Sequence, residues 1–531
     1  MQLTKEQQYI LDLVRQGEPL IKILAFAGSG KTTILKEIAK ANPDKKMLYL
    51  AFNKAIQVEA NKKFPKNTEV RTTHSLAYKY IVSRNNYKVR NGDYRLVELK
   101  KILAEEDWAI LKYTKALLKT FFNTDYDSVE EAYNKRHSNL FENAPEGIDK
   151  SRVKELTIQL YTLMKTGTVE ITHDFYLKEF QLKLKKKEVS IKPYDVILLD
   201  EAQDLNKVVF NIFKYLPAKQ KVVVGDNHQS IYSFRGAVNA LNKFKDAKTA
   251  YLTTSFRLIP DIATYATHIL KNLKLEDKAL IGGNKKREYD IQTTAYISRT
   301  NSGLINKFSH LLEYHIPLTK IKFVRHPYEI FGLLLNLQKF KMGKDLDESY
   351  QYLLNYEANS LSELNKKAKE ADDKELISAI RVLNILSKCN YNIFELYKQA
   401  VLGYNYNKDK EAPYVLLTAH TSKGLEFDKV VLLAGFSVVD NVVSLFQEKG
   451  KEVLGVDELF MLYTTDEIAA KIIGTIKGYK NPSVIEEFNL FYVAVTRARY
   501  EIELNRGELK IFFKSNSLKE FLDNFNKEMM I

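Results

Sequence analysis

Apolar residues gather in two sets of short runs along the chain. The first set lies at residues 20–27, 47–52, 195–199 and 221–225, and the second at 293–297, 414–418, 429–434 and 500–504. Each run is nearly continuous and ends at small or polar residues, which is typical of strands that are buried on both faces of a parallel sheet. We therefore expect two α/β cores, one in each half of the chain.

Two long stretches have a different pattern. Residues 85–190 and about 336–410 are rich in Leu, Lys, Glu, Tyr and Asn at helical spacing, and they contain few β-branched runs. This spacing predicts amphipathic helices. The fold class that follows is α/β, with two parallel sheets that each carry a mainly helical insertion.

A glycine-rich loop follows the first predicted strand. From Ala25 the chain reads Ala-Phe-Ala-Gly-Ser-Gly-Lys-Thr, and residues 33–41 then have helical periodicity. In a strand, loop and helix of this kind, backbone N–H groups and the helix N-terminus attract a phosphate. Lys31 is suited to reach the β and γ phosphates and Thr32 to bind Mg²⁺. The alternative is a glycine-rich turn before an ordinary helix.

Two adjacent carboxylates follow the run at 195–199. Asp200 and Glu201 should lie at the carboxyl edge of the sheet, where ligands bind in open α/β folds. Asp200 is suited to hold Mg²⁺, and Glu201 to orient and deprotonate an attacking water. An acidic surface turn is the alternative. Arg257 and Arg497 are candidates for stabilising the leaving phosphate, although spacing alone does not assign this role.

Composition and charge narrow the class of protein. Lys plus Arg number 81 and Asp plus Glu 66, which gives a net charge of +15 and favours a polyanionic partner. The apolar fraction of 45% excludes general disorder, and one cysteine, Cys389, excludes an internal disulfide and a cysteine-based zinc site. We find no secretion signal and no apolar run of about 18 residues, so we expect a cytoplasmic protein without membrane contact.

A series of segments resembles, in order, the motifs of the superfamily 1A DNA helicases of the UvrD/Rep/PcrA type. These segments are residues 3–7, 25–32, 52–55, 72–75, 200–204, 225–237, 255–257, 418–427 and 492–498. Residues 25–28, 51–54, 73–78 and 172–178 look most like the F-box DNA helicase branch. We expect no F-box in this sequence, because the first motif begins at the N-terminus.

The resemblance implies two RecA-like P-loop NTPase motor domains with parallel sheets, each with a mainly helical insertion. It places domain 1A at 1–84 and 191–255, insertion 1B at 85–190, domain 2A at 256–335 and 411–531, and a reduced insertion 2B at 336–410. Family members hydrolyse Mg-ATP between the two motor domains. They translocate 3′-to-5′ on single-stranded DNA and unwind the duplex ahead.

The resemblance also implies roles for individual nucleotide-site residues. Gln7 would read adenine, Phe256 would stack on it, and Glu426 would lie near the ribose. Gln229 would sense the γ-phosphate, which Arg257 and Arg497 would contact. The phosphate loop would comprise Ala27, Gly28, Ser29, Gly30, Lys31, Thr32 and Thr33, with Lys31, Asp200 and Glu201 as catalytic residues and Thr32 and Asp200 as metal ligands.

On the DNA side, Tyr232 and Phe234 lie beside the segment that would sense the γ-phosphate. Aromatic rings there could stack bases, at about 1–3 kcal/mol per base, although core packing is the alternative. The candidate DNA contacts are Asn53, Lys54, Thr73, His74, Tyr232, Phe234, Arg235 and His420. Neither of these two histidines has a second ligand at metal spacing.

We therefore expect an ATP-dependent helicase that uses ATP and Mg²⁺ and acts on single-stranded and tailed duplex DNA. A monomer or a weakly self-associating protein is expected. A DNA-stimulated ATPase that strips proteins from a strand, or that serves as a motor subunit, would carry the same motifs. A P-loop NTPase or kinase without a nucleic-acid partner is a third hypothesis, which the segments at 418–427 and 492–498 argue against.

Overall fold

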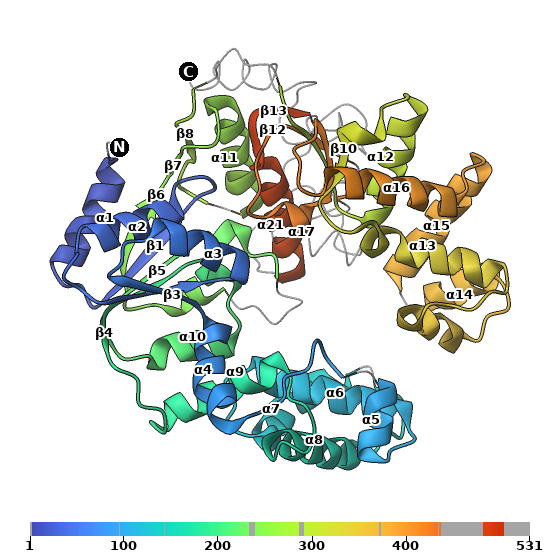
Figure 1. The fold of residues 1–531 in the computed structure, drawn as a ribbon, viewed down its shortest axis with the longest axis horizontal. Coiled ribbons are helices and arrows are strands. Elements are labelled where there is room, and N and C mark those ends of the chain that lie inside the picture. Colours follow the sequence, from blue (N-terminus) through green and yellow to red (C-terminus); the bar gives the residue numbers. More distant parts are fainter. Residues whose placement is uncertain are drawn as a thin grey trace, which may run out of the picture. The chain divides into compact units, whose positions relative to one another are not determined.

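The computed structural model describes residues 3–94, 96–142, 144–232, 239–274, 276–285, 291–370, 373–433, 435–436 and 482–503. Contacts divide the chain into two compact units, Met1–Leu252 and Thr253–Ile531 (Figure 1). The boundaries of the motor domains and of their insertions, as expected from the sequence, stay predictions.

Unit 1, Met1–Leu252, is built in its described part on a six-stranded sheet with the order β3-β2-β4-β5-β1-β6. All neighbouring strands pair in parallel, so their carboxyl ends meet at one edge. The strands are β1 (Leu20–Ala25), β2 (Met47–Ala51), β3 (Thr68–Thr72), β4 (Tyr194–Leu199), β5 (Ala218–Gly225) and β6 (Lys248–Leu252).

Helices cover both faces of this sheet. One face packs on α1 (Lys5–Arg15) and α2 (Lys31–Lys40), with α3 (Lys54–Lys63) beside them. The other face packs on α4 (Thr73–Asn85) and α10 (Lys207–Tyr215). Alternate residues of a strand enter opposite cores, so Tyr49 packs with the first group and Leu48 and Leu50 with the second.

The stretch between α4 and β4 is helical in its described part, as its spacing predicts. It forms α5 (Leu96–Leu103), α6 (Trp108–Asn123), α7 (Val129–Phe141), α8 (Lys150–Lys165) and α9 (His173–Lys185). Figure 1 shows α5 to α8 gathered on the side of unit 1 away from α1 and α2. Their apolar side chains continue the core on the α4 and α10 face of the sheet.

Unit 2, Thr253–Ile531, has in its described part a five-stranded parallel sheet with the order β10-β11-β9-β12-β13. The strands are β9 (Thr294–Ser298), β10 (Ile321–Phe323), β11 (Tyr414–Thr418), β12 (Phe427–Leu432) and β13 (Ala498–Glu503). A separate parallel pair consists of β7 (Thr254–Ser255) and β8 (Ile281–Gly282).

The helices of unit 2 fall into two groups. Those close to the sheets are α11 (Pro260–Lys274), α12 (Asn301–Glu313), α17 (Ala419–Ser422) and α21 (Pro482–Val495). Between β10 and β11 lie α13 (Pro327–Lys341), α14 (Leu361–Glu370), α15 (Lys374–Lys388) and α16 (Ile393–Asn407). The expected α/β class, with two parallel sheets and helical insertions, is confirmed. Among the described helices, none combines the length and apolar character needed to cross a bilayer.

Candidate functional site

The loop between β1 and α2 has the backbone shape of a phosphate cradle. Gly28 and Gly30 have φ angles of 70° and 84°, in the left-handed region that glycine enters without steric cost. Ser29 is 1% exposed, and its hydroxyl donates a 2.7 Å hydrogen bond to the carbonyl of Phe26, which closes the loop. Because α2 begins at Lys31, the N–H groups of its first turn, including that of Thr33, lack partners within the helix.

Asp200 lies at the end of β4 and is 2% exposed. Its Oδ2 accepts hydrogen bonds from the Thr32 hydroxyl at 3.2 Å and from the Tyr49 hydroxyl at 2.9 Å, and its Oδ1 accepts from the Glu201 N–H. The two predicted metal ligands, 168 residues apart, are therefore in contact. Burial raises the pKa of Asp200 and neighbouring Glu201 raises it further, whereas Lys31 lowers it. A bound cation would favour the charged carboxylate.

Glu201 faces the phosphate loop through its contact with Lys31. The Lys31 Nζ lies 3.5 Å from the Glu201 Oε1, and Gln203 donates a hydrogen bond to the other carboxylate oxygen. Glu201 has a φ of 50°, which costs a residue other than glycine about 1–3 kcal/mol. Such strain is typical of functional sites.

Gln203 joins the ends of β4 and β5. Its Oε1 accepts the backbone N–H of Asp226 at 3.1 Å, and a Cβ at Gly225 would lie 2.3 Å from this oxygen, so a larger residue there would displace the Gln203 amide. Asp226 in turn accepts a 2.7 Å hydrogen bond from the side chain of Gln229, which is 4% exposed. This series of contacts, which sequence reasoning missed, links Glu201 to the segment that precedes the predicted DNA-contacting tyrosine.

Gln7 has a polar atom that lacks a partner. Gln7 and Thr4 form a reciprocal cap at the start of α1, in which the Gln7 Oε1 accepts the Thr4 N–H at 3.1 Å. The Gln7 side chain is 1% exposed, and its Nε2 has no hydrogen-bond partner among the described residues. Buried donors are rarely left unpaired, so this amide fits the predicted contact with adenine.

These residues fit a magnesium nucleotide. The left-handed loop, the start of α2 and Lys31 suit the phosphates, and the oxygens of Thr32 and Asp200 suit Mg²⁺. Within the described ranges, no cluster of three or more His, Cys, Asp or Glu forms a metal cage. Magnesium usually takes one or two carboxylates together with substrate phosphates, which agrees with the sparse set of ligands.

A cluster of ion pairs surrounds Glu426 in unit 2. The Arg257 Nε lies 2.7 Å from the Glu426 Oε2, and an Arg257 guanidinium nitrogen donates to the carbonyl of Thr496 at 3.2 Å. Glu426 also pairs with Arg499, a residue that sequence reasoning did not single out. Burial raises the pKa of Glu426, but the hydrogen bonds from Arg499 and Arg257 hold that pKa below its ordinary value.

Arg497 is buried within unit 2 and is 1% exposed. Its Nε donates to the carbonyl of Val493 at 2.9 Å, and another guanidinium nitrogen donates to the carbonyl of Leu425 at 3.2 Å. These bonds tie α21 to the loop before Glu426. Phe256 is 42% exposed, which leaves its ring open to stacking. The phosphate and adenine roles of these residues stay predictions.

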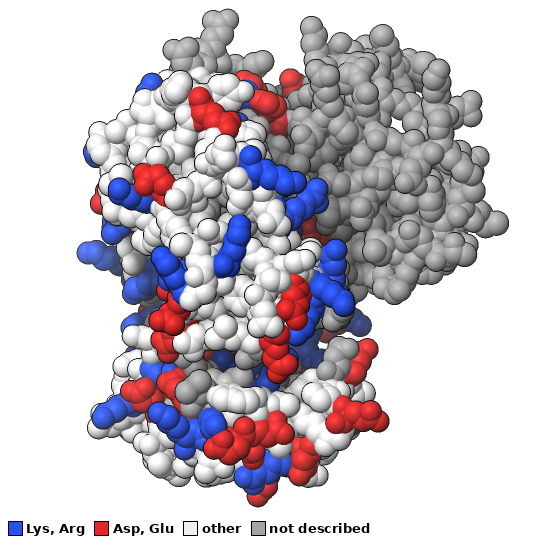
Figure 2. Space-filling view, turned by 90° about the vertical axis from the view of Figure 1, so that its right-hand side faces the viewer, with Lys and Arg blue, Asp and Glu red and all other residues white. Residues whose placement is uncertain are grey.

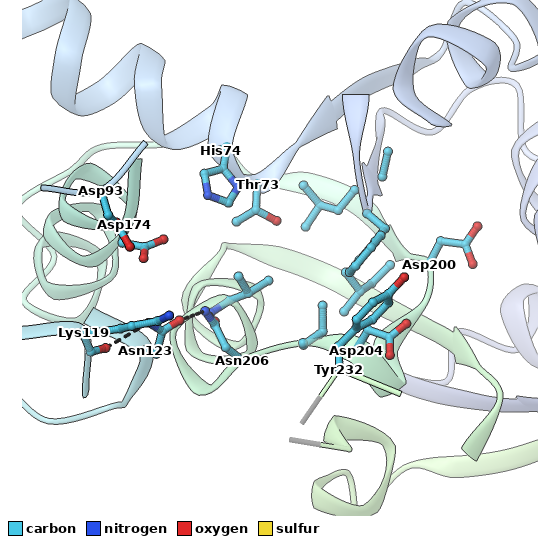
Figure 3. Close-up of a pocket in the computed structure, with 16 residues that line it drawn as sticks. Thr73, His74, Asp93, Lys119, Asn123, Asp174, Asp200, Asp204, Asn206 and Tyr232 are labelled. Carbon is cyan, nitrogen blue, oxygen red and sulfur yellow. Dashed lines mark hydrogen bonds between the residues drawn. The ribbon is translucent and has the colours of Figure 1, made fainter. Parts of the chain in front are cut away.

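Four residues of the DNA-side motifs line one cavity of about 400 Å³ in unit 1 (Figure 3). They are Phe52, Thr73, His74 and Tyr232, and the other residues that line the cavity include Asp93, Lys119, Asn123, Asp174 and Asn206. The rings of Phe52 and Tyr232 are stacked, with centroids 6.2 Å apart and planes 18° apart. Phe52 is 37% exposed, so it is a candidate base contact that we had not singled out.

His74 stands at the upper side of this cavity in Figure 3, whereas the Asp200 carboxylate points away from it. Desolvation by the surrounding protein, together with the charge of His173, lowers the pKa of His74 to about 4. His74 is therefore neutral near pH 7 and would contact DNA by a hydrogen bond. Thr73 is the first residue of α4.

The other DNA candidates are spread more widely. Asn53 caps α3 by accepting the Ile56 N–H at 2.9 Å, and Lys54 donates to the side chain of Gln57 at 3.1 Å. His420 lies in α17 of unit 2. Phe234 and Arg235 lie outside the described residues.

The positive charge does not form one continuous patch on the face that Figure 2 shows. Lysine and arginine side chains are interspersed with aspartate and glutamate over the described residues of that face. The net charge of +15 therefore gives no location for a nucleic-acid surface. A nucleic-acid surface must therefore be located from the cavities and the side chains that line them.

Comparisons with known proteins agree with the motif order. Residues 3–249 match the UvrD/REP helicase N-terminal domain. F-box DNA helicase 1 of Gallus gallus is 30% identical to this chain, and the match covers 94% of this chain and 48% of the relative. F-box DNA helicase protein 1 of Schizosaccharomyces pombe is 27% identical, and that match covers 98% of this chain and 59% of the relative. The probable DNA helicase II homologue of Mycoplasma genitalium is 24% identical over 96% of this chain and 86% of its own.

The chain spans about half the length of the first two of these relatives. The similarity covers both described units, and the family match covers the unit that carries the phosphate loop and Asp200. Residues 3–249 therefore carry a UvrD/REP helicase N-terminal domain, and the chain is similar over nearly all of its length to proteins named F-box DNA helicases.

Proposed function

We propose that the protein is an ATP-dependent DNA helicase that translocates 3′-to-5′ on single-stranded DNA. One observation carries this proposal. In unit 1, Gln203 hydrogen-bonds both Glu201 at the phosphate site and the backbone of Asp226, and Asp226 accepts a hydrogen bond from Gln229. Gln229 lies three residues before Tyr232, and Tyr232 lines the aromatic cavity. A change at the phosphates therefore has a short route to a surface suited to bases.

In the proposed reaction, the loop N–H groups and Lys31 bind the phosphates. Glu201 orients the attacking water and accepts its proton, because its contact with Lys31 keeps the carboxylate beside the loop. Thr32 and Asp200 would hold Mg²⁺, which supplies positive charge to the phosphate oxygens when it is bound. Gln7 would bind the adenine through its unpaired Nε2.

We further propose that unit 2 supplies Arg257 and Arg497 to the same reaction. Charge builds up on the transferred phosphoryl group, and a positioned arginine stabilises that charge. The ion pair of Arg257 with Glu426 would then be exchanged for a phosphate contact. Phe256 and Glu426 would contact the adenine and the ribose.

On the DNA side, Phe52 and Tyr232 would stack on a base, while Thr73 and His74 would form hydrogen bonds. Asn53, Lys54 and His420 are proposed as backbone contacts. Gln229, which hydrogen-bonds Asp226, would pass the state of the γ-phosphate to Tyr232. The stacking ring would then shift at each ATP turnover and move the strand.

A DNA-stimulated ATPase that displaces proteins without strong unwinding is the second candidate. The small size of the helical stretch from α13 to α16 in unit 2 favours it, because the resemblance associates this position with a larger domain. Strand displacement on 3′-tailed, 5′-tailed and blunt duplexes distinguishes the two. ATP-dependent unwinding of the 3′-tailed duplex supports the helicase, and ATP turnover without displacement supports the translocase. An ATP turnover rate that does not change when single-stranded DNA is added would contradict both the helicase and the translocase.

A further inference from the structure

A second hollow adjoins the cavity of Figure 3. It is a groove of about 490 Å³ along α4, lined by Arg71, His74, Ser75, Tyr78, Lys79, Ser83 and Tyr176. His74 lines both the groove and the cavity, so the two hollows meet at one side chain. A strand that leaves the cavity past His74 would enter this groove.

The groove presents a fixed aromatic ring to solvent. Tyr78 is 45% exposed, and its ring meets that of Tyr176 edge to face, with centroids 5.9 Å apart. The Tyr176 hydroxyl is hydrogen-bonded to the His173 Nδ1 at 2.9 Å, which anchors the supporting ring. Proteins that bind single strands without sequence preference stack bases on rings of this kind.

The charges around the groove suit a phosphate. Arg71 and Lys79 line it, and no carboxylate is among its lining residues. The Arg71 Nε lies 3.0 Å from a carboxylate oxygen of Glu69, and the charge of Lys79 also lowers the pKa of Glu69. Two positive side chains therefore surround one negative side chain. The net charge is positive at a place where a backbone would pass beside Tyr78.

We propose that this groove binds one further nucleotide of the DNA strand, with its base stacked on Tyr78 and its phosphate near Lys79 and Arg71. The inference rests on the proposed function, because it takes the cavity of Figure 3 as the binding place of the preceding nucleotide. The resemblance assigns no role to Tyr78, Lys79 or Arg71. The groove would lengthen the binding site beyond His74.

The test measures the affinity of the full chain for fluorescent oligo(dT) of increasing length, from about 4 to about 16 nucleotides, without ATP. Tyr78→Ala should weaken the longer oligomers by about fivefold to about a hundredfold, as expected for loss of one stacked base, and leave the shortest unchanged. Tyr78→Phe, which retains the ring, should bind like the wild type. Lys79→Ala should lower the salt slope of binding by about one.

Trp108→Ala is the matched control. Trp108 is 48% exposed, and the Lys100 Nζ lies 5.2 Å from the centre of its ring. Trp108 and Lys100 therefore resemble Tyr78 and Lys79 as an exposed ring with a lysine beside it, but Trp108 lines neither the cavity nor the groove. It should bind like the wild type at all lengths. Photo-crosslinking of wild-type protein to 5-iododeoxyuridine oligomers gives a readout that needs no variant, and it should label Tyr78.

Each contrary result has a distinct meaning. Wild-type protein that binds no single-stranded DNA would overturn the proposed function and the inference together. Wild-type binding with unchanged affinities for Tyr78→Ala and Lys79→Ala would overturn the inference alone and leave the groove to another class of partner. A Tyr78→Ala loss that is equal at every length would overturn the claim of a further nucleotide.

Discussion

The hydroxyl of Tyr49 donates a 2.9 Å hydrogen bond to Oδ2 of Asp200, the same oxygen that accepts the hydroxyl of Thr32. Tyr49 is fully buried on β2, and its ring lies 4.5 Å from that of Phe64. Burial raises the pKa of Tyr49, so the hydroxyl remains a donor at all ordinary pH values. Tyr49 therefore positions the carboxylate that is proposed to bind Mg²⁺.

Tyr49→Phe keeps the ring and removes this hydrogen bond. We expect the Mg²⁺ concentration for half-maximal ATP turnover to rise about tenfold to about a hundredfold, because a hydrogen bond to a charged group is worth about 1.5–3 kcal/mol. ADP binding without metal should not change. The measurements are turnover against Mg²⁺ concentration and binding of Mn²⁺ in the presence of ADP.

Tyr194→Phe is the control for this prediction. The Tyr194 hydroxyl also donates a hydrogen bond to a carboxylate, that of Glu69, at 2.7 Å. Tyr194 is the first residue of β4, whereas Asp200 follows the last residue of that strand. Its Mg²⁺ dependence should equal that of the wild type. Equal shifts in both variants would mean that loss of a buried hydroxyl, rather than the position of Asp200, changes the metal affinity.

Lys31→Ala should abolish ATP hydrolysis and leave DNA affinity largely intact, because Lys31 faces Glu201 and does not line the aromatic cavity. Lys36→Ala, on the same helix, should retain normal turnover. Steady-state ATPase rates and DNA anisotropy measure the two properties. Hydrolysis that persists in Lys31→Ala would show that the nucleotide binds elsewhere.

Arg257→Ala should lower kcat by about a thousandfold or more and change the KM for ATP little, as expected for an arginine that stabilises the transition state. Arg257→Lys should rescue poorly, because lysine lacks the planar fork that contacts Glu426 and that is proposed to contact phosphate. Arg325→Ala, at an arginine that is half exposed and pairs with Glu329, is the control. A raised KM with normal kcat would instead assign Arg257 to ground-state binding.

Lys178 gives a prediction about pH. Its Nζ is buried and donates to the carbonyls of Thr124 and Tyr126 and to the side chain of Gln181. Burial lowers the pKa of Lys178 from 10.5 to about 7. Between about pH 7 and pH 10.5, Lys178 is protonated in the unfolded chain and neutral in the folded chain. The contribution of Lys178 to the free energy of unfolding therefore rises with pH over this range and is lowest below about pH 7.

The comparison is with Lys178→Met, which cannot titrate. Unfolding by denaturant at pH 7, 8 and 9 should show the wild type gaining stability relative to the variant as pH rises. The variant should be less stable at pH 9, because two buried carbonyls lose their donor, at about 1–3 kcal/mol each. A difference that does not change with pH would mean that Lys178 stays charged when folded.

The central strands could be predicted from the sequence because both of their faces are buried. The runs that became β1, β2, β4 and β5 consist mostly of apolar residues, as do those of β11 and β12. The edge strands β3 and β6 were missed, because Thr-Glu-Val-Arg-Thr has a single apolar residue and Lys-Thr-Ala-Tyr-Leu begins with two polar residues. β10 is only three residues long.

The motifs located the phosphate loop and Asp200, but they did not reveal the partners of these residues. Tyr49 looks like any residue of an apolar strand, and its acceptor lies 151 positions later in the chain. Arg499 was not singled out, because its pairing with Glu426 depends on how β13 aligns with β12. Such contacts are set by the fold, so local sequence carries no signal for them.

The most direct test of the account is whether ATP turnover moves the protein along single-stranded DNA. The measurement is displacement of streptavidin from oligonucleotides that carry biotin at the 5′ or the 3′ end. We predict ATP-dependent displacement from the 5′ end, little from the 3′ end, and none with Lys31→Ala. Turnover stimulated by DNA without displacement from either end, or displacement that survives in Lys31→Ala, would contradict the account.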